Sequence, residues 1–96
     1  MITISIFDHA GGFAENKDTA RELRLKSIIP ALEENGEVIL DFAGVGSATQ
    51  SFVHAMISDI MRKYGSDVLE RIEFKNCNEN VREIISIVVD YMQQAD

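Results

Sequence analysis

The chain has few of the residues on which disulfide-linked, membrane-spanning or exported proteins depend. Its 96 residues include one cysteine, so no disulfide can close within it. A lone cysteine favours a reducing compartment, and we expect a cytoplasmic protein. No run approaches the ~18 apolar residues of a membrane helix. Residues 1–7 largely alternate apolar and polar side chains, which is not the pattern of a signal peptide.

Basic residues are scarce as well. Nine Lys and Arg face sixteen Asp and Glu, which gives a net charge of −7. Binding to a phosphate backbone needs clustered Lys and Arg, and so does binding to an anionic membrane. We therefore expect neither nucleic acid nor a membrane as partner. The negative charge suits a protein partner that carries a basic patch.

Many metal and catalytic sites use histidine or cysteine. Here these residues are too few and too scattered along the sequence to indicate such a site. His9, His54 and Cys77 show no ligand spacing, so we expect no metal and no cofactor. Cys77 precedes a predicted helix, where a thiolate can be stabilised, but we expect a partly buried structural thiol rather than a redox role. Ser51 and His54 lie three residues apart with no third group to orient the imidazole. We expect no enzymatic activity.

Apolar residues make up 46% of the chain, and their spacing predicts three strands. Alternation favours strands at residues 2–7 and 71–75. Residues 37–42 form a near-continuous apolar run, typical of a central strand covered on both faces. Residues 13–16 fit a short strand or a loop equally well.

Three helices are predicted between and after these strands. Thr19-Ala20-Arg21-Glu22 forms a capping-box pattern, so the first helix should run from there to Glu34, with a break near Pro30. The second runs from Thr49 or Ser51 to Tyr64, before Gly65. The third follows a cap at Asn78 or Asn80.

Strands that alternate with helices imply right-handed crossovers and parallel pairing. We predict one α/β domain, residues 1–96, with a small open sheet of three or four mostly parallel or mixed strands and three helices. Sites in such sheets form outside the carboxyl ends of the strands. Here those places are the loop at 43–51 and the segment 76–80.

The loop between the central strand and the second helix carries three hydroxyls, on Ser47, Thr49 and Ser51. A hydroxyl there can cap the helix, and a phosphate there would meet free amides and the positive end of the helix dipole. Phosphorylation adds nearly two negative charges, enough to switch a docking surface. Caps and a tight turn are the simpler interpretation. Gly44 and Gly46 do not form a nucleotide-binding motif.

Asp41 ends the central strand. With no histidine or nucleophile at a fixed spacing, we expect its carboxylate to brace the following loop rather than to act as a base.

The order of elements resembles the STAS domain, the fold of anti-sigma-factor antagonists. The resemblance rests on Val-Ile-Leu-Asp-Phe-Ala-Gly-Val at 38–45 and on Thr-Gln-Ser-Phe at 49–52. The chain is most similar to a bacterial STAS-like family of largely unassigned function. Further features of that family are Gly12-Phe13 before the first helix, Arg21 or Arg24 near its start, and a late Asn-x-Asn, here Asn76 and Asn78. The resemblance spans nearly the whole chain.

The resemblance implies a regulatory, non-enzymatic protein-interaction module. In anti-sigma-factor antagonists, a GHKL-type ATPase acting as a serine kinase phosphorylates a serine at this helix start and binds only the unphosphorylated form. By position from Asp41 that serine is Ser51, although Thr49-Gln50-Ser51-Phe52 stands where Asp-Ser-Ser-Gly is usual. The partner-binding loop would then comprise Gly44, Gly46, Ser47, Thr49, Gln50 and Ser51, with Ser51 as the candidate phosphoacceptor.

Other interpretations stay open from the residues alone. A small-ligand sensor would bind an anion or a nucleotide at the same helix start, with Arg21 or Arg24 nearby. A hydrolase would use Ser51 with His54. A homodimer would form through edge strands or an apolar helix surface, and the sequence does not choose between monomer and dimer.

Overall fold

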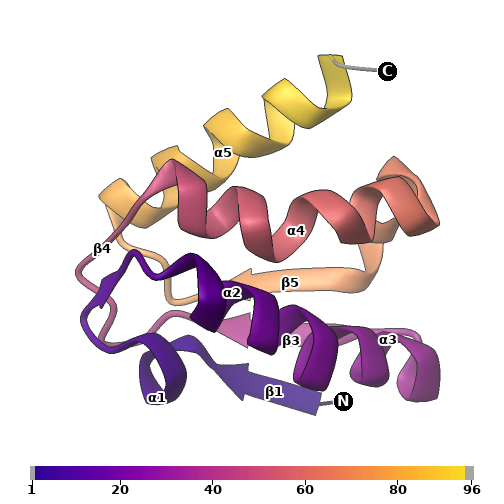
Figure 1. Cartoon of the computed structure of the whole chain (residues 1–96), viewed down its shortest axis with the longest axis horizontal. Coiled ribbons are helices and arrows are strands. Elements are labelled where there is room, and N and C mark those ends of the chain that lie inside the picture. Colours follow the sequence, from indigo (N-terminus) through magenta and orange to yellow (C-terminus); the bar gives the residue numbers. More distant parts are fainter. Residues whose placement is uncertain (1, 95–96) are drawn as a thin grey trace.

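Three parallel strands form the main sheet of the computed structural model, which describes residues 2–94. They are β1 (Ile2–Ser5), β3 (Val38–Asp41) and β5 (Ile72–Lys75), in the order β1-β3-β5 (Figure 1). The α/β class and the parallel pairing are confirmed. The expected domain, 1–96, includes residues 1, 95 and 96, which lie outside the described residues. That the chain forms one domain stays a prediction.

The helices that connect the strands lie on one side of this sheet. Both crossovers, β1 to β3 and β3 to β5, step across the sheet in the same direction. Because such crossovers are right-handed, their helices fall on the same face. Figure 1 shows α2 (Lys17–Leu23) across the front of β3, and α4 (Gln50–Tyr64) running alongside β5, above it in this view. On the other face Thr3 and Glu73 are exposed and Ile39 between them is half-buried, so the prediction of a strand covered on both faces was wrong.

The predicted number of three helices was also wrong, because the described residues contain five α-helices. The first, α1 (Ile6–Ala10), occupies part of the predicted strand 2–7. Its cause is Ser5, whose hydroxyl accepts a 3.2 Å hydrogen bond from the Asp8 amide and so starts a helix. A 3-10 segment, η2 (Ser66–Arg71), precedes β5 and takes in Arg71, the first residue of the strand predicted at 71–75.

The predicted first helix is one helical stretch in three parts. These are α2, a π-helical turn η1 (Arg24–Ile28) and α3 (Ile29–Asn35). The amide of Ile29 donates to the carbonyl of Arg24, five residues back. Pro30 follows at once, and its ring would crowd a carbonyl in a regular helix, which explains the wider turn.

The start of α2 differs from the predicted capping box. Asn16 Oδ1 accepts from the amides of Asp18 and Thr19, at 2.8 and 3.2 Å. The helix therefore begins at Lys17, and the prediction of Thr19 as the cap was wrong. An asparagine three residues earlier already satisfies the free amides of the first turn.

A second, two-stranded sheet joins two loops. Its strands are β2 (Phe13–Ala14) and β4 (Ser47–Ala48), paired in parallel with Phe13 opposite Ser47. The open question about residues 13–16 is thus answered in favour of a strand for Phe13 and Ala14. This pairing fixes the segment after α1 beside the segment that leads into α4.

Helix α4 is the centre of the packing and contacts both α2 and α5 (Glu79–Gln94). Phe52, Met56 and Ile60 on its inner side are fully buried. On its α2 side, Arg24 Nη1 donates a 2.6 Å hydrogen bond to the carbonyl of Ala55. Among the described residues, none of the helices combines the length and apolarity needed to cross a membrane.

Candidate functional site

The carboxyl ends of β3 and β5 are joined by a single carboxylate. Asp41 accepts 2.9 Å hydrogen bonds from the side-chain amide of Asn76 and from the backbone amide of Ala43. These two donors, and to a lesser degree the charge of Lys75, lower the pKa of Asp41 below its ordinary value of 3.8, although slight burial acts in the opposite direction. Asp41 thereby holds the first residues of the loop at 43–46.

The segment 76–80 completes this edge, next to the loop as the topology predicted. Asn78 donates to the carbonyl of Gly46 at 2.8 Å and accepts from the amide of Val81 at 2.9 Å, so it fixes the loop and caps α5. The amide of Gly46 in turn donates to the carbonyl of Gly12 at 2.8 Å. The loop is thus held from two sides while Gly46 itself remains exposed.

The three hydroxyls of the loop have different roles. Thr49 Oγ1 accepts a 3.1 Å hydrogen bond from the amide of Phe52 and is the cap of α4. Ser47 lies half-buried in β4. Ser51, the second residue of α4, is exposed, and within residues 2–94 its side chain makes no hydrogen bond. Ser51 is therefore the hydroxyl that another molecule can reach.

Two aromatic rings border the loop. Phe7 in α1 and Phe13 in β2 are 45% and 53% exposed. The ring of Phe7 lies against Gly44, where an added Cβ would come within 3.0 Å of it. Gly44 also has a φ of +89°, which glycine adopts without strain. The predicted strand at residues 2–7 did not place Phe7 on a helix beside the loop. Ser5, followed three residues later by Asp8, is a helix-start signal that could have indicated this position.

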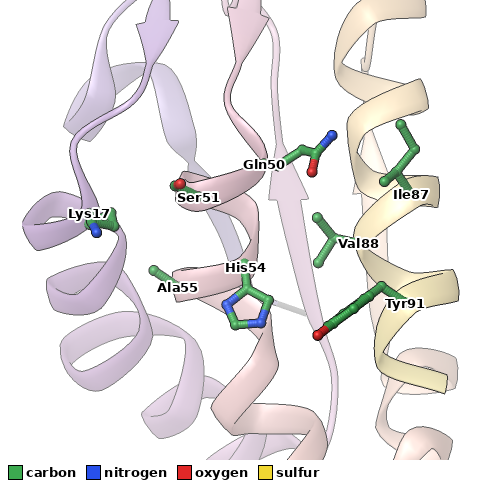
Figure 2. A pocket seen from close by; sticks show the side chains of 8 residues that line it. All are labelled: Lys17, Gln50, Ser51, His54, Ala55, Ile87, Val88 and Tyr91. Carbon is green, nitrogen blue, oxygen red and sulfur yellow. The ribbon is translucent and has the colours of Figure 1, made fainter. Parts of the chain in front are cut away.

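A hollow of about 430 Å³ opens on the outer side of α4 (Figure 2). Figure 2 shows α2 on one side of it and α5 on the other. The imidazole of His54 and the ring of Tyr91 stand nearly edge to face, with centroids 6.4 Å apart. Eight residues from these three helices line it: Lys17, Gln50, Ser51, His54, Ala55, Ile87, Val88 and Tyr91.

A family model described as a STAS-like domain of unknown function matches residues 19–82. The chain belongs to this STAS-like family. The matched region contains β3, the loop with Asp41 and Gly44, all of α4 and the Asn76–Asn78 segment. Neither a curated protein nor a solved structure matches the chain.

In this STAS-like domain the two arginines expected near an anion do not line the hollow. Arg24 is engaged elsewhere, since its guanidinium binds the Ala55 carbonyl and pairs with Asp59 at 3.3 Å. Arg21 is exposed on α2 outside the lining. Among the described residues, the cation that lines the hollow is Lys17, which precedes the matched region.

Ser51 and His54 share the hollow, so the pair that a hydrolase would use is brought together. No aspartate or glutamate belongs to the described lining, and none is there to orient the imidazole. Cys77 is half-buried, and burial raises the pKa of its thiol, which disfavours the thiolate. Within residues 2–94, no three His, Cys, Asp or Glu side chains group closely enough to hold a metal ion. A homodimer stays a prediction.

Proposed function

We propose that this STAS-like domain is a non-enzymatic regulatory module that binds a protein partner at one edge and is switched by phosphorylation of Ser51. We call this surface the docking edge and define it as Phe7, Gly12, Phe13 and residues 43–51. The proposal rests on the exposure of Ser51 and on its hydroxyl being free of any role in capping the helix. Of the three hydroxyls at the start of α4 it is the exposed one, and it does not cap the helix.

The docking edge is held in shape before any partner arrives. Asp41 and Asn78 hold the loop from the β5 side, and the carbonyl of Gly12 holds it from the β2 side. A surface that is already ordered loses little conformational entropy on binding, which favours affinity.

The composition of the docking edge also supports protein binding. Phe7 and Phe13 leave much of their rings exposed. Aromatic side chains dominate the binding energy of many protein interfaces. The backbone of Gly44 and Gly46 between them allows close approach of a partner.

A phosphate on Ser51 would leave the fold intact. Ser51 lies in the first turn of α4, which contains no acidic residue, and negative charge there is favourable to the helix dipole. The effect of modification would therefore be on the partner, through two added negative charges in the contact. From the family resemblance, the partner is a GHKL-type ATPase that acts as the serine kinase and binds the unmodified form.

The first test is phosphorylation. Each purified GHKL-type ATPase of the source bacterium is incubated with the domain and ATP, and the modified residue is located by tandem mass spectrometry. We expect one phosphate, on Ser51, and none on Ser51→Ala. The matched control is Ser86→Ala, which removes an exposed serine of α5 and should leave modification unchanged. Phosphate on Ser47 or Thr49 instead, or on no residue, contradicts the proposal.

The second test is affinity for the same ATPase, measured by titration calorimetry. Ser51→Asp should weaken binding about tenfold or more, the equivalent of about 1.4 kcal/mol. Ser51→Ala, which keeps the surface neutral, should bind as the wild type does. Ser86→Asp adds the same charge away from the docking edge and should have little effect. Equal affinities for Ser51→Asp and the wild type would refute the switch.

A further inference from the structure

The hollow between α2, α4 and α5 shares Gln50 and Ser51 with the docking edge, and its other six lining residues are ones that the docking edge does not use. The exposed side of α4 forms its floor, Lys17 stands on the α2 side, and α5 forms the opposite wall (Figure 2). Its volume of about 430 Å³ lies within the range of about 300–1,000 Å³ that is typical of small-molecule sites.

The α5 wall is apolar and unusually exposed. Ile87 and Tyr91 are 41% and 63% exposed, and both line the hollow together with Val88. Tyr91 and His54 present ring surfaces that a flat group can stack on. Covering these side chains would remove apolar surface from water.

The polar part of the lining selects for negative charge. The chain has sixteen acidic residues and a net charge of −7, yet none of the described lining residues is acidic and one, Lys17, is a cation. At the start of α4, Thr49 already accepts from the amides of Phe52 and Val53. The preceding amides, of Gln50 and Ser51, have no acceptor within the helix and lie at its positive end.

We propose that this hollow binds a small organic anion that has a flat apolar body. The anionic group lies near Lys17 and the hydroxyl of Ser51, and the body lies against Tyr91 and Ile87. Charge complementarity in an otherwise acidic chain favours this occupant over a neutral one. The inference does not depend on the proposed protein partner. Gln50 and Ser51 also belong to the docking edge, but binding of the anion needs neither a phosphate on Ser51 nor a partner on the rest of that edge.

The test is a titration of the ¹⁵N-labelled full chain, followed by amide chemical shifts, with phenyl phosphate as the probe. We expect saturable shifts at Ser51, His54 and Tyr91, with a dissociation constant in the millimolar range, as fits so small a ligand. Inorganic phosphate tests the anionic group alone and benzyl alcohol tests the apolar body alone. Both should bind more weakly than phenyl phosphate.

Charge reversal tests the role of Lys17. Lys17→Glu should weaken binding of phenyl phosphate about fivefold or more. The variant should fold, because an acidic residue is favourable in the first turn of α2. Lys26→Glu is the matched control, since it makes the same charge change in η1 at an exposed residue outside the lining, and it should leave the affinity within about twofold.

A second variant keeps the test independent of Lys17. Ser51→Asp places a carboxylate in the hollow and should also weaken binding of phenyl phosphate, while benzyl alcohol should be unaffected. Equal affinities for Lys17→Glu and Lys26→Glu would overturn the proposal. So would shifts centred on Phe7 and Phe13 instead of the hollow, or inorganic phosphate that binds as well as phenyl phosphate.

Discussion

At the scale of single residues, the carboxylate of Asp41 joins two loops that lie 35 residues apart in the sequence. Its hydrogen bonds to Asn76 and Ala43 favour the ionised form, so folding lowers its pKa. A group whose pKa is lowered on folding stabilises the protein above its unfolded pKa, here the ordinary value of 3.8. That contribution is lost as the pH falls through the folded value.

We therefore expect Asp41→Asn to change the acid sensitivity of the fold. Wild type should lose stability more steeply than Asp41→Asn as the pH falls from about 5 toward 3, because the variant has no proton to bind at this site. Urea unfolding at a series of pH values measures this difference. Asp67→Asn removes an exposed carboxylate from η2, away from the loop, and serves as control. If Asp41→Asn keeps the pH dependence of the wild type, then folding does not favour the ionised form of Asp41.

A second prediction at the scale of single residues concerns Gly44. Gly44→Ala should destabilise the fold by about 1–2 kcal/mol, because its φ of +89° is unfavourable for any side chain and the new Cβ would press on the ring of Phe7. Thermal unfolding measures the loss. In Gly46→Ala the Cβ would stand at an ordinary 3.5 Å from the Gly12 carbonyl, so this control should lose much less. Equal losses of stability in both variants would contradict the explanation that the positive φ and the ring of Phe7 exclude a side chain at Gly44.

The sequence indicated a cap at the start of α4, where the hydrogen-bond partner is near in the chain, but it did not indicate Ser5 or Asn16, whose partners are equally near. The hydroxyl of Thr49 accepts a hydrogen bond from an amide three residues away, and helix-capping rules, which use only neighbouring residues, predict such a bond. Lys17 and Tyr91 meet at the hollow from opposite ends of the chain, and no local rule connects them.

At the scale of elements, the start of α4 carries two hydroxyls with different roles. That of Thr49 caps the helix, and that of Ser51 makes no hydrogen bond within residues 2–94. Thr49→Ala removes the cap and should lower the free energy of unfolding by about 1 kcal/mol. Ser51→Asp should raise it by about 0.3–1 kcal/mol through the helix dipole, and Ser51→Ala should change it by less than about 0.5 kcal/mol. Urea unfolding at neutral pH gives all three values. A loss in Ser51→Ala as large as that in Thr49→Ala would show that Ser51 is structural.

The elements that the sequence predicts well are those with strong signals at both ends. Helix α4 has an apolar stripe, a threonine cap and Gly65 after Tyr64. Its end at Tyr64 was predicted correctly, and its start at Gln50 lies between the two predicted starts, Thr49 and Ser51. Helix α1 and the start of α2 were missed because Ser5 and Asn16 cap them from within segments given to strand or loop. The pairing of β2 with β4 joins two-residue strands, too short for any periodic pattern.

At the scale of the whole molecule, the alternation of strands and helices predicted the parallel sheet. It did not predict that one face stays open. That follows from the order β1-β3-β5, in which both right-handed crossovers deliver their helices to the same side. The hollow was not predictable either, since it needs the relative placement of three helices. The two proposed recognition surfaces, the docking edge and the hollow, meet at Gln50 and Ser51, and the open face of the sheet is largely polar.

The most direct test is the footprint of the proposed partner, a GHKL-type kinase, on the ¹⁵N-labelled domain, mapped by amide chemical shifts. We predict that shifts and line broadening concentrate at Gly12–Ala14 and Gly44–Ser51, and that they disappear when Ser51 carries phosphate. Signals of Thr3 and Glu73, on the open face of the sheet, should stay unchanged. A footprint on that open face, with Gly44–Ser51 unaffected, would contradict the central claim.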